Sequence, residues 1–212
     1  MIPREVESLP HIVHRSMMAE LKQRIAPYHQ ALEMDANIWA SLTSRAAYRN
    51  LLSRFFGFIA ALEGSLVVID DLQIWLPDVS ERWKTPLLIK DLELSGISSE
   101  QCPICTIIPD IRSVGTAFGC LYVLEGSTLG GQIIARQVYK HLGLTPENGC
   151  QFFSSYGATV GPMWKNFGEH LETWCAANEV CRGEIVRSAA ETFACFSRWL
   201  ASNGLAGMDA DA

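Results

Sequence analysis

Two short stretches of the sequence hold residues whose types and spacing could do chemistry, and the first is LKQRIAPYHQALE. It places His29 on an expected helix, with Lys22 two turns earlier and near the same face. A single helical histidine is more often a hydrogen-bonded core or surface residue than a metal ligand. A neutral imidazole that faces a cavity can nonetheless hold an iron atom from one side. A lysine two turns away could then pair with an acidic group of the bound molecule.

The second stretch, YVLEGSTLGGQ, places Gly126, Gly130 and Gly131 inside a segment that otherwise favours a long helix. Each glycine inside a helix costs about 1 kcal/mol relative to alanine, so the three together cost about 3 kcal/mol. That is a sizeable part of the roughly 5–15 kcal/mol that stabilises a typical domain. Gly126 and Gly130 are four residues apart and therefore lie one above the other on one face of the helix. There the bare backbone can approach a partner closely.

Three kinds of partner could lie against this bare backbone. Another helix of a soluble protein is the more common reason for small residues at positions i and i+4, and a planar ligand is the second. A partner helix within a membrane is disfavoured, because Glu125, Gln132 and Arg136 interrupt the apolar run that such a contact requires. The spacing of the glycines alone does not choose between a packed helix and a planar ligand.

The elements that must position these residues are helices. Apolar residues recur at helical spacing along most of the chain, whereas the alternation typical of strands is almost absent. A first helix is expected from about Ser16, with a kink or a restart at Pro27, because proline removes a backbone hydrogen bond and clashes with the preceding turn. The further helices are expected over 44–72, from an N-cap at Thr85 to Gly96, from an N-cap at Asp110 to about His141 with a stop at Gly143, over 159–177 and over 179–201, with a loop over 97–109.

Length and composition support one domain. The chain has 212 residues, and 49% of them are hydrophobic, which is enough for a full core without disulfide or metal staples. We therefore predict a single all-α domain over 1–212, in which 1–13 form an extension and 203–212 a frayed tail.

Charge and the absence of targeting signals narrow the class of protein further. The net charge of −6 disfavours a protein that coats nucleic acid. Neither a secretory signal nor an apolar run long enough to span a membrane is visible, which predicts a cytoplasmic protein without a membrane partner. The seven cysteines are expected to be mostly reduced thiols. Cys102 and Cys105 form a C-x2-C pair with no second pair or histidines, so loop thiols explain them better than a metal site.

Three stretches taken together, LKQRIAPYHQALE, YVLEGSTLGGQ and FFSSYGATVGPMWKNF, resemble the signature regions of haem oxygenases. The likeness is greatest to the bacterial biliverdin-producing enzymes that are often paired with bacteriophytochromes, and it covers about residues 20–200 in the family's order. The resemblance implies an all-α bundle that holds haem between a proximal and a distal helix. It also implies oxidative cleavage of haem, which is both cofactor and substrate, to biliverdin, carbon monoxide and ferrous iron. Dioxygen (O2) and an electron donor such as ferredoxin or a flavin reductase would take part, and a bacteriophytochrome is a candidate recipient of the product.

The resemblance also implies roles for individual residues. His29 matches the proximal axial ligand of the haem iron, and Gly126 and Gly130 match the distal-helix glycines that make room for the ring and for O2. Lys22 and Lys165 match bases that contact the haem propionates. Phe193 matches an aromatic residue that packs around the macrocycle.

The chain departs from the family pattern at a few positions. Ser127 stands where animal members carry a carboxylate that organises water, and a serine hydroxyl can hold a water but cannot act as a carboxylate. Glu169 stands where a second basic propionate contact would be expected, and Pro27 could shift the imidazole of His29. Two alternatives to a haem oxygenase therefore stay open: a non-catalytic haem-binding or haem-sensing protein on the same fold, and an unrelated helical protein whose glycines serve packing.

Overall fold

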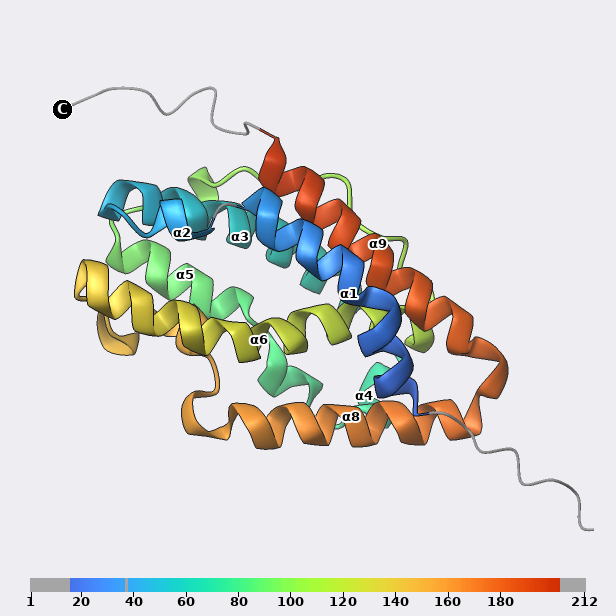
Figure 1. Ribbon diagram of the computed structural model, residues 1–212. Helices are drawn as coiled ribbons and strands as arrows, with labels where there is room; N and C mark the ends of the chain where they lie inside the picture. The colour runs from blue at the N-terminus through green and yellow to red at the C-terminus, as the bar shows by residue number, and fades with distance from the viewer. Residues whose placement is uncertain (1–15, 37, 203–212) are drawn as a thin grey trace, which may run out of the picture.

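The structure, a computed structural model, describes residues 16–36 and 38–202, and this part of the chain consists of helices and short loops, with no strand (Figure 1). The predicted extension over 1–13 and tail over 203–212 lie outside the described residues. The α-helices are α1 (Met17–Ala36), α2 (Ile38–Ser41), α3 (Arg45–Leu66), α4 (Leu72–Trp75), α5 (Thr85–Leu94), α6 (Val114–Leu142), α7 (Gln151–Ser154), α8 (Val160–Ala177) and α9 (Arg182–Ala201). Short 3-10 helices lie between them: η1 (Val79–Arg82), η2 (Ser99–Gln101), η3 (Pro146–Asn148), η4 (Gly157–Thr159) and η5 (Glu179–Cys181).

The all-α prediction is confirmed, but two predicted N-caps are wrong. The cap of α6 is Ser113, whose hydroxyl accepts from the Thr116 N–H in a capping box, while the exposed Asp110 pairs with Arg112 instead. Thr85 is the first residue of α5 and not its cap, because the buried carboxylate of Glu63 accepts from the first backbone N–H groups. Both errors have one cause: several residues near a helix start can cap it, and tertiary contacts choose among them.

Other predicted bounds need smaller corrections. The helix expected over 44–72 ends at Leu66, and the short α4 follows after a turn. The loop expected over 97–109 contains the 3-10 turn η2, and α9 begins three residues after its predicted start because η5 precedes it. The predicted stop of α6 is confirmed, since Gly143 adopts a left-handed conformation with a φ of 68° that glycine tolerates.

Helix α1, which carries His29, continues through Pro27 from Met17 to Ala36, so the expected restart does not occur. Its start is held by α8: the carboxylate of Glu172 accepts from the N–H groups of Met17 and Met18, each at 3.0 Å, and from the Ser16 hydroxyl. A carboxylate at a helix N-terminus satisfies unpaired N–H groups and complements the helix dipole.

Replacing Glu172 with glutamine is expected to destabilise the fold by about 1 kcal/mol at neutral pH, the usual cost of losing an N-terminal cap. Burial raises the pKa of Glu172, but hydrogen bonds from Ser16, Met18 and Met17 outweigh this and hold that pKa below its ordinary value. The ionised carboxylate therefore stabilises the fold above the unfolded pKa of about 4.3, and this contribution is lost as the pH falls through the folded pKa. Urea unfolding at pH 7 and pH 4 measures both effects.

The matched control is Glu169→Gln on the same helix. Glu169 is exposed and pairs at 3.4 Å with the exposed Lys165, a surface ion pair that contributes little to stability. This variant should unfold at nearly the same urea concentration as the wild type. Equal stabilities for Glu172→Gln and the wild type at pH 7 would contradict the capping role.

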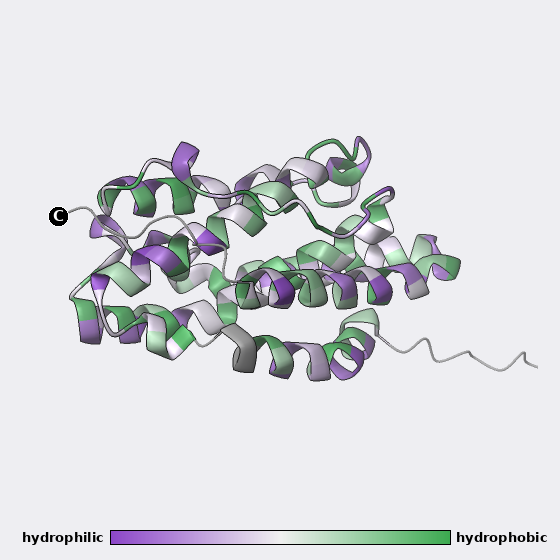
Figure 2. Cartoon of the chain, turned by 90° about the horizontal axis from the view of Figure 1, so that it is seen from above, coloured by the Kyte–Doolittle hydropathy of each residue, from purple (hydrophilic) through white to green (hydrophobic). Residues whose placement is uncertain are grey.

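The core is one continuous cluster of apolar side chains from all the long helices. Each of these helices has hydrophilic and hydrophobic residues along its length, as expected for helices with one exposed and one buried face (Figure 2). Helix α9 is central to the arrangement, because both α1 and α6 pack against it (Figure 1). The contact with α6 is close at Gly119, where an added Cβ would collide with the backbone of Ile185 on α9. No helix in the described ranges is both long and apolar enough to cross a membrane.

Candidate functional site

The structure brings His29 and Phe193 together. His29 lies on the exposed side of α1, and its ring meets the ring of Phe193 on α9 edge-on, with 5.7 Å between centroids. Phe193 itself is buried and forms part of the core. An aromatic ring packed against an imidazole restricts its rotation, so this pair can hold the histidine in one orientation.

The glycines of α6 fall into two groups when a Cβ is added to each. At Gly131 the added atom would lie 2.8 Å from the carbonyl oxygen of Phe153, so this glycine is required for close packing. Among the described residues it would meet no atom within 4 Å at Gly130, and at Gly126 it would meet only the Trp164 ring at an ordinary 3.5 Å. A packed helix therefore explains Gly131, but not Gly126 or Gly130.

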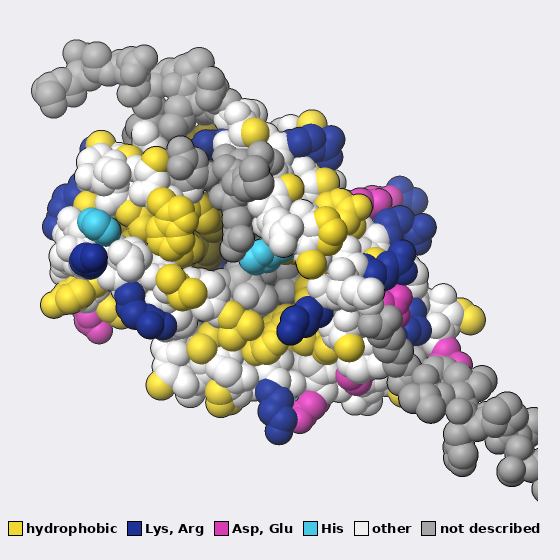
Figure 3. Space-filling view, viewed as in Figure 1, with side chains coloured by type: hydrophobic (Ala, Val, Ile, Leu, Met, Phe, Trp, Pro, Cys, Tyr) yellow, Lys and Arg dark blue, Asp and Glu magenta, His cyan; other side chains and the backbone are white. Residues whose placement is uncertain are grey.

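Large apolar side chains are exposed on α6 next to Gly130 and on α2. Leu129 and Ile133 lie within one turn of Gly130 on α6, and they are 41% and 53% exposed although both are large and hydrophobic. Trp39 on α2 is also largely exposed. The space-filling view shows hydrophobic side chains gathered beside a hollow in the face that carries α1, α2 and α6, with one histidine side chain next to it (Figure 3). An exposed apolar surface around a hollow is typical of a site for a hydrophobic ligand.

Lys22 on α1 and Lys165 on α8 both lie within about one turn of the contact between these two helices. Gly168 on α8 packs against the Met18 side chain on α1, with an added Cβ 3.4 Å away. Lys22 follows Met18 by one turn, and Lys165 precedes Gly168 by about one turn. Lys22 is exposed, and the Lys165 side chain is 80% exposed and pairs with Glu169. Both lysine side chains therefore lie at the surface of the molecule.

Two hydroxyl groups between Gly126 and Gly130 donate hydrogen bonds to backbone carbonyls of α6. Ser127 is exposed, and its hydroxyl donates to the Leu124 carbonyl at 2.7 Å, while the buried Thr128 hydroxyl donates to the Glu125 carbonyl at 2.6 Å. Such bonds to the preceding turn often bend a helix. Because the Ser127 proton is engaged within the helix, this hydroxyl can accept a hydrogen bond from a water but has no proton left to donate.

Sequence reasoning missed a buried charge cluster behind the glycines, which we call the Glu125 cluster: Glu125, Arg82, Lys84 and Tyr156. The Glu125 carboxylate is 1% exposed and accepts from Arg82 at 2.5 Å, from Lys84 at 2.8 Å and from the Tyr156 hydroxyl at 2.8 Å. A glutamate within the apolar run LYVLEG did indicate a buried carboxylate that needs a cation. Its cationic partners Lys84 and Arg82 are 41 and 43 residues away in sequence and Tyr156 is 31 residues away, so only the fold identifies them.

The surroundings of the cluster fix its protonation pattern. Burial raises the pKa of Tyr156 well above its usual range, and the negative charge of Glu125 raises it further, so the phenol keeps its proton and donates it. Burial lowers the pKa of Lys84, although the charge of Glu125 opposes this. Burial alone would lower the pKa of Arg82, but Asp78 and Glu125 outweigh it and raise that pKa, so the guanidinium stays charged.

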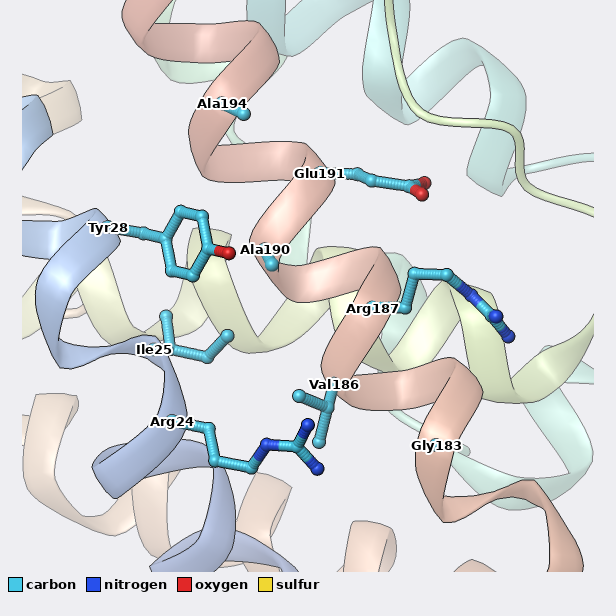
Figure 4. Close-up of a pocket in the computed structure, with 9 residues that line it drawn as sticks. All are labelled: Arg24, Ile25, Tyr28, Gly183, Val186, Arg187, Ala190, Glu191 and Ala194. Carbon is cyan, nitrogen blue, oxygen red and sulfur yellow. The ribbon is translucent and has the colours of Figure 1, made fainter.

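A groove of 520 Å³ lies elsewhere, between α1 and α9. Figure 4 shows Arg24, Ile25 and Tyr28 of α1 on one side of it, and on the other side α9 residues that include Ala190 and Arg187. His29 does not line this groove, because residues 24, 25 and 28 lie on the other flank of the buried stripe of α1. The groove is therefore separate from the surface around His29.

The described side chains offer no metal site of their own. Within residues 16–36 and 38–202, no three His, Cys, Asp or Glu side chains come together in a way that could hold a metal ion. Cys102 and Cys105 are buried thiols without a disulfide. His29, the residue expected to bind a metal carried by a ligand, is exposed on α1.

The chain is similar to known proteins of one kind. The family model described as "Heme oxygenase" matches residues 15–202. Solved structures with the same fold include heme oxygenases from Neisseria meningitidis (22% identity, 87% of this chain and 90% of that chain, TM-score 0.74) and Leptospira interrogans (16%, 88% and 99%, TM-score 0.70). Another is heme oxygenase-1 from the cyanobacterium Synechocystis in complex with heme (15%, 88% and 91%, TM-score 0.65). Among curated proteins, none matches the chain in sequence.

Proposed function

The chain belongs to the haem oxygenase family, and on that basis we propose that it cleaves haem, its substrate, to biliverdin, carbon monoxide and ferrous iron. Dioxygen and external electrons are the co-reactants of this reaction. One observation supports the proposal most directly: packing among the described residues requires a glycine at neither Gly126 nor Gly130, since an added Cβ would meet nothing within 4 Å at Gly130 and only the Trp164 ring, at an ordinary 3.5 Å, at Gly126. Three helix-breaking residues in one segment cost about 3 kcal/mol, and contacts within the described protein require only Gly131.

The residues around α6 fit haem. The bare backbone at Gly130 leaves the space that a side chain would fill, Leu129 and Ile133 offer apolar contacts, and Lys22 and Lys165 offer positive charge for two carboxylates. His29 would hold the iron, and Phe193 would keep the imidazole oriented. Bound haem supplies the iron at which dioxygen is activated.

The residues of the chain would bind haem, orient it and restrict the approach of small molecules to its ring. A neutral histidine ligand gives less electron push than a thiolate, which favours chemistry other than oxygen–oxygen cleavage at the metal. The close glycine backbone restricts the directions open to a small molecule between α6 and the ring, so one edge of the ring is favoured. Ser127 can hold a water as an acceptor, because its own proton is engaged with Leu124.

The proposal includes partners and a location. The reaction needs reducing equivalents, and a ferredoxin or a flavin reductase in the cytoplasm is the expected donor. The sequence likeness to biliverdin-producing bacterial enzymes favours a bacteriophytochrome as recipient of the product. A direct test of this recipient is transfer of the product to a bacteriophytochrome apoprotein, followed by the red absorption band of the holoprotein.

A non-catalytic haem-binding or haem-sensing protein is the second candidate function. Ser127 favours it, because the position holds no carboxylate and the hydroxyl proton is already engaged within α6. A water network organised by an acceptor alone would deliver protons more slowly than one with a carboxylate. Haem binding is common to both candidates, and turnover separates them.

Single turnover of the haem-reconstituted protein tests the proposal. Excess haem is removed, and a ferredoxin-type donor system or ascorbate is added in air, with catalase present so that free peroxide cannot degrade haem. We expect the Soret band to disappear while a biliverdin spectrum grows. A haem complex that stays intact would favour the binding or sensing protein, and failure to bind haem would overturn both candidate functions.

A further inference from the structure

We propose that the Glu125 cluster is a positioning device: it fixes the backbone of α6 at Gly126 against α8, and thereby determines which edge of haem is attacked. Its second consequence, the choice of edge, rests on the proposed function. The first, the position of α6 relative to α8, is a property of the haem-free protein. Glu125 and its partners would act through Gly126 and Trp164, so they are positioning residues.

Every side-chain N–H group of the two cations in the cluster, Arg82 and Lys84, has a hydrogen-bond acceptor. Arg82 donates to Asp78 through Nε and Nη2, to Asn166 through Nη2, and to Glu125 and the Met163 carbonyl through Nη1, which uses all five of its N–H groups. Lys84 donates to the Arg82 carbonyl, to Glu125 and to the Tyr156 hydroxyl, which uses all three of its own. A fully satisfied buried network tolerates little displacement of its members, because any shift leaves a buried charge without a partner.

The network joins α6 to α8 at the point where Trp164 of α8 lies against Gly126. On α8, Met163 and Asn166 accept hydrogen bonds from Arg82, and Trp164, one of the two residues between them, packs its ring against Gly126. The Trp164 ring also contacts Tyr122 one turn earlier on α6 and stacks on Phe167. Arg82 therefore holds the turn of α8 that carries Trp164 in a fixed position relative to α6. The Trp164 ring in turn covers one side of Gly126.

A second set of contacts holds the same stretch of α6 from behind. The segment 153–156 places Tyr156 on Glu125, and the Ser154 carbonyl accepts from Gln132 at 2.8 Å. Gly131 lets the Phe153 carbonyl approach α6 closely. Ser155 adopts a φ of 37°, the one non-glycine residue in the described ranges with a positive φ. Strained backbone persists where the surrounding structure fixes it, which indicates that this segment is held in one position.

Burying charged side chains costs desolvation free energy that apolar side chains would not cost, which indicates that the charges here serve to position the helices. Replacing a buried ion pair with apolar residues of similar size is often neutral or stabilising, so such a pair is weak evidence for a role in stability. What the ions provide is directionality, because each bond has a required length and angle. Apolar packing at the same place would allow α6 to rotate or slide with little change in energy.

The test uses Glu125→Gln and the milder Tyr156→Phe, with Tyr48→Phe as matched control. Tyr48 is also a buried tyrosine, and its hydroxyl donates to the Gly149 carbonyl at 3.1 Å, outside the Glu125 cluster. Each protein is labelled with 5-fluorotryptophan, and the Trp164 resonance is identified among the six tryptophans by its loss in Trp164→Phe. In the haem-free protein, we expect the Trp164 resonance to move in Glu125→Gln and Tyr156→Phe and to stay in Tyr48→Phe.

The second readout is the ratio of biliverdin isomers after single turnover. A displacement of about 1 Å can change a rate about a hundredfold, so we expect the isomer ratio to change at least about threefold in the two cluster variants and not in Tyr48→Phe.

If Glu125→Gln fails to fold, Tyr156→Phe carries both measurements. An unmoved Trp164 resonance in a folded variant would overturn the positioning role, whereas a moved resonance with the wild-type isomer ratio would overturn its effect on the reaction. If the wild type binds no haem, the proposed function fails while the fluorine spectra still decide the positioning role.

Discussion

Alanine in place of His29 is expected to abolish haem cleavage. His29 is exposed on α1 with its ring against Phe193, and it is the residue that we propose as the ligand of the haem iron. Even residues that only support a metal ligand cost about 10–100-fold in affinity or activity when removed, so loss of the ligand itself should lower single-turnover cleavage by more than about a hundredfold. The measurement is the rate of Soret decay with growth of biliverdin, under catalase.

The control for this variant is His141→Ala. His141 is an exposed histidine in the last turn of α6, about three turns from Gly130. This variant should cleave haem at the wild-type rate. Added imidazole should restore the ferric haem spectrum of His29→Ala, since it can occupy the space of the missing ring. Wild-type turnover in His29→Ala would show that another residue holds the iron.

The sequence predicted the helices well because their signal is local. Apolar periodicity gives the buried stripe of each long helix, and glycine with a positive φ ends α6 where expected, at Gly143. The starts were predicted less well. Ser113 and Asp110 are both good caps by residue type, and the choice of Ser113 depends on contacts such as its bond to Glu184 of α9, which lies 71 residues away.

The candidate site divides in the same way. His29 and the glycines were visible as residue types at helical spacing, but which glycines close packing requires could be seen only from the atoms near each of them. The Glu125 cluster was visible only as one glutamate in an apolar run. Its cations come from the segment around η1 and its phenol from the loop before η4, and no periodicity links segments so far apart in sequence.

Leucine at Gly130 is expected to stabilise the haem-free protein and to weaken haem binding. Among the described residues an added Cβ meets no atom within 4 Å, and leucine favours a helix over glycine by about 0.8–1 kcal/mol. The melting temperature of the haem-free protein should therefore rise by about 2–4 °C. The same side chain would occupy the face left for the ring, so haem affinity should fall at least about tenfold, or about 1.4 kcal/mol. Thermal unfolding without haem and haem titration measure the two effects.

Alanine at the neighbouring Gly131 should do the opposite to the haem-free protein. Its Cβ would lie 2.8 Å from the Phe153 carbonyl oxygen, a backbone atom that cannot move without its segment. Overpacking of this kind costs about 1–3 kcal/mol, which outweighs the gain of about 1 kcal/mol in helix propensity. Replacing a glycine that close packing requires should destabilise the protein. Replacing a glycine that leaves room for a ligand should weaken only the binding of that ligand. If Gly130→Leu lowered the melting temperature without changing haem affinity, Gly130 would belong with Gly131 as a packing residue, and the bare face of α6 would no longer support a haem site.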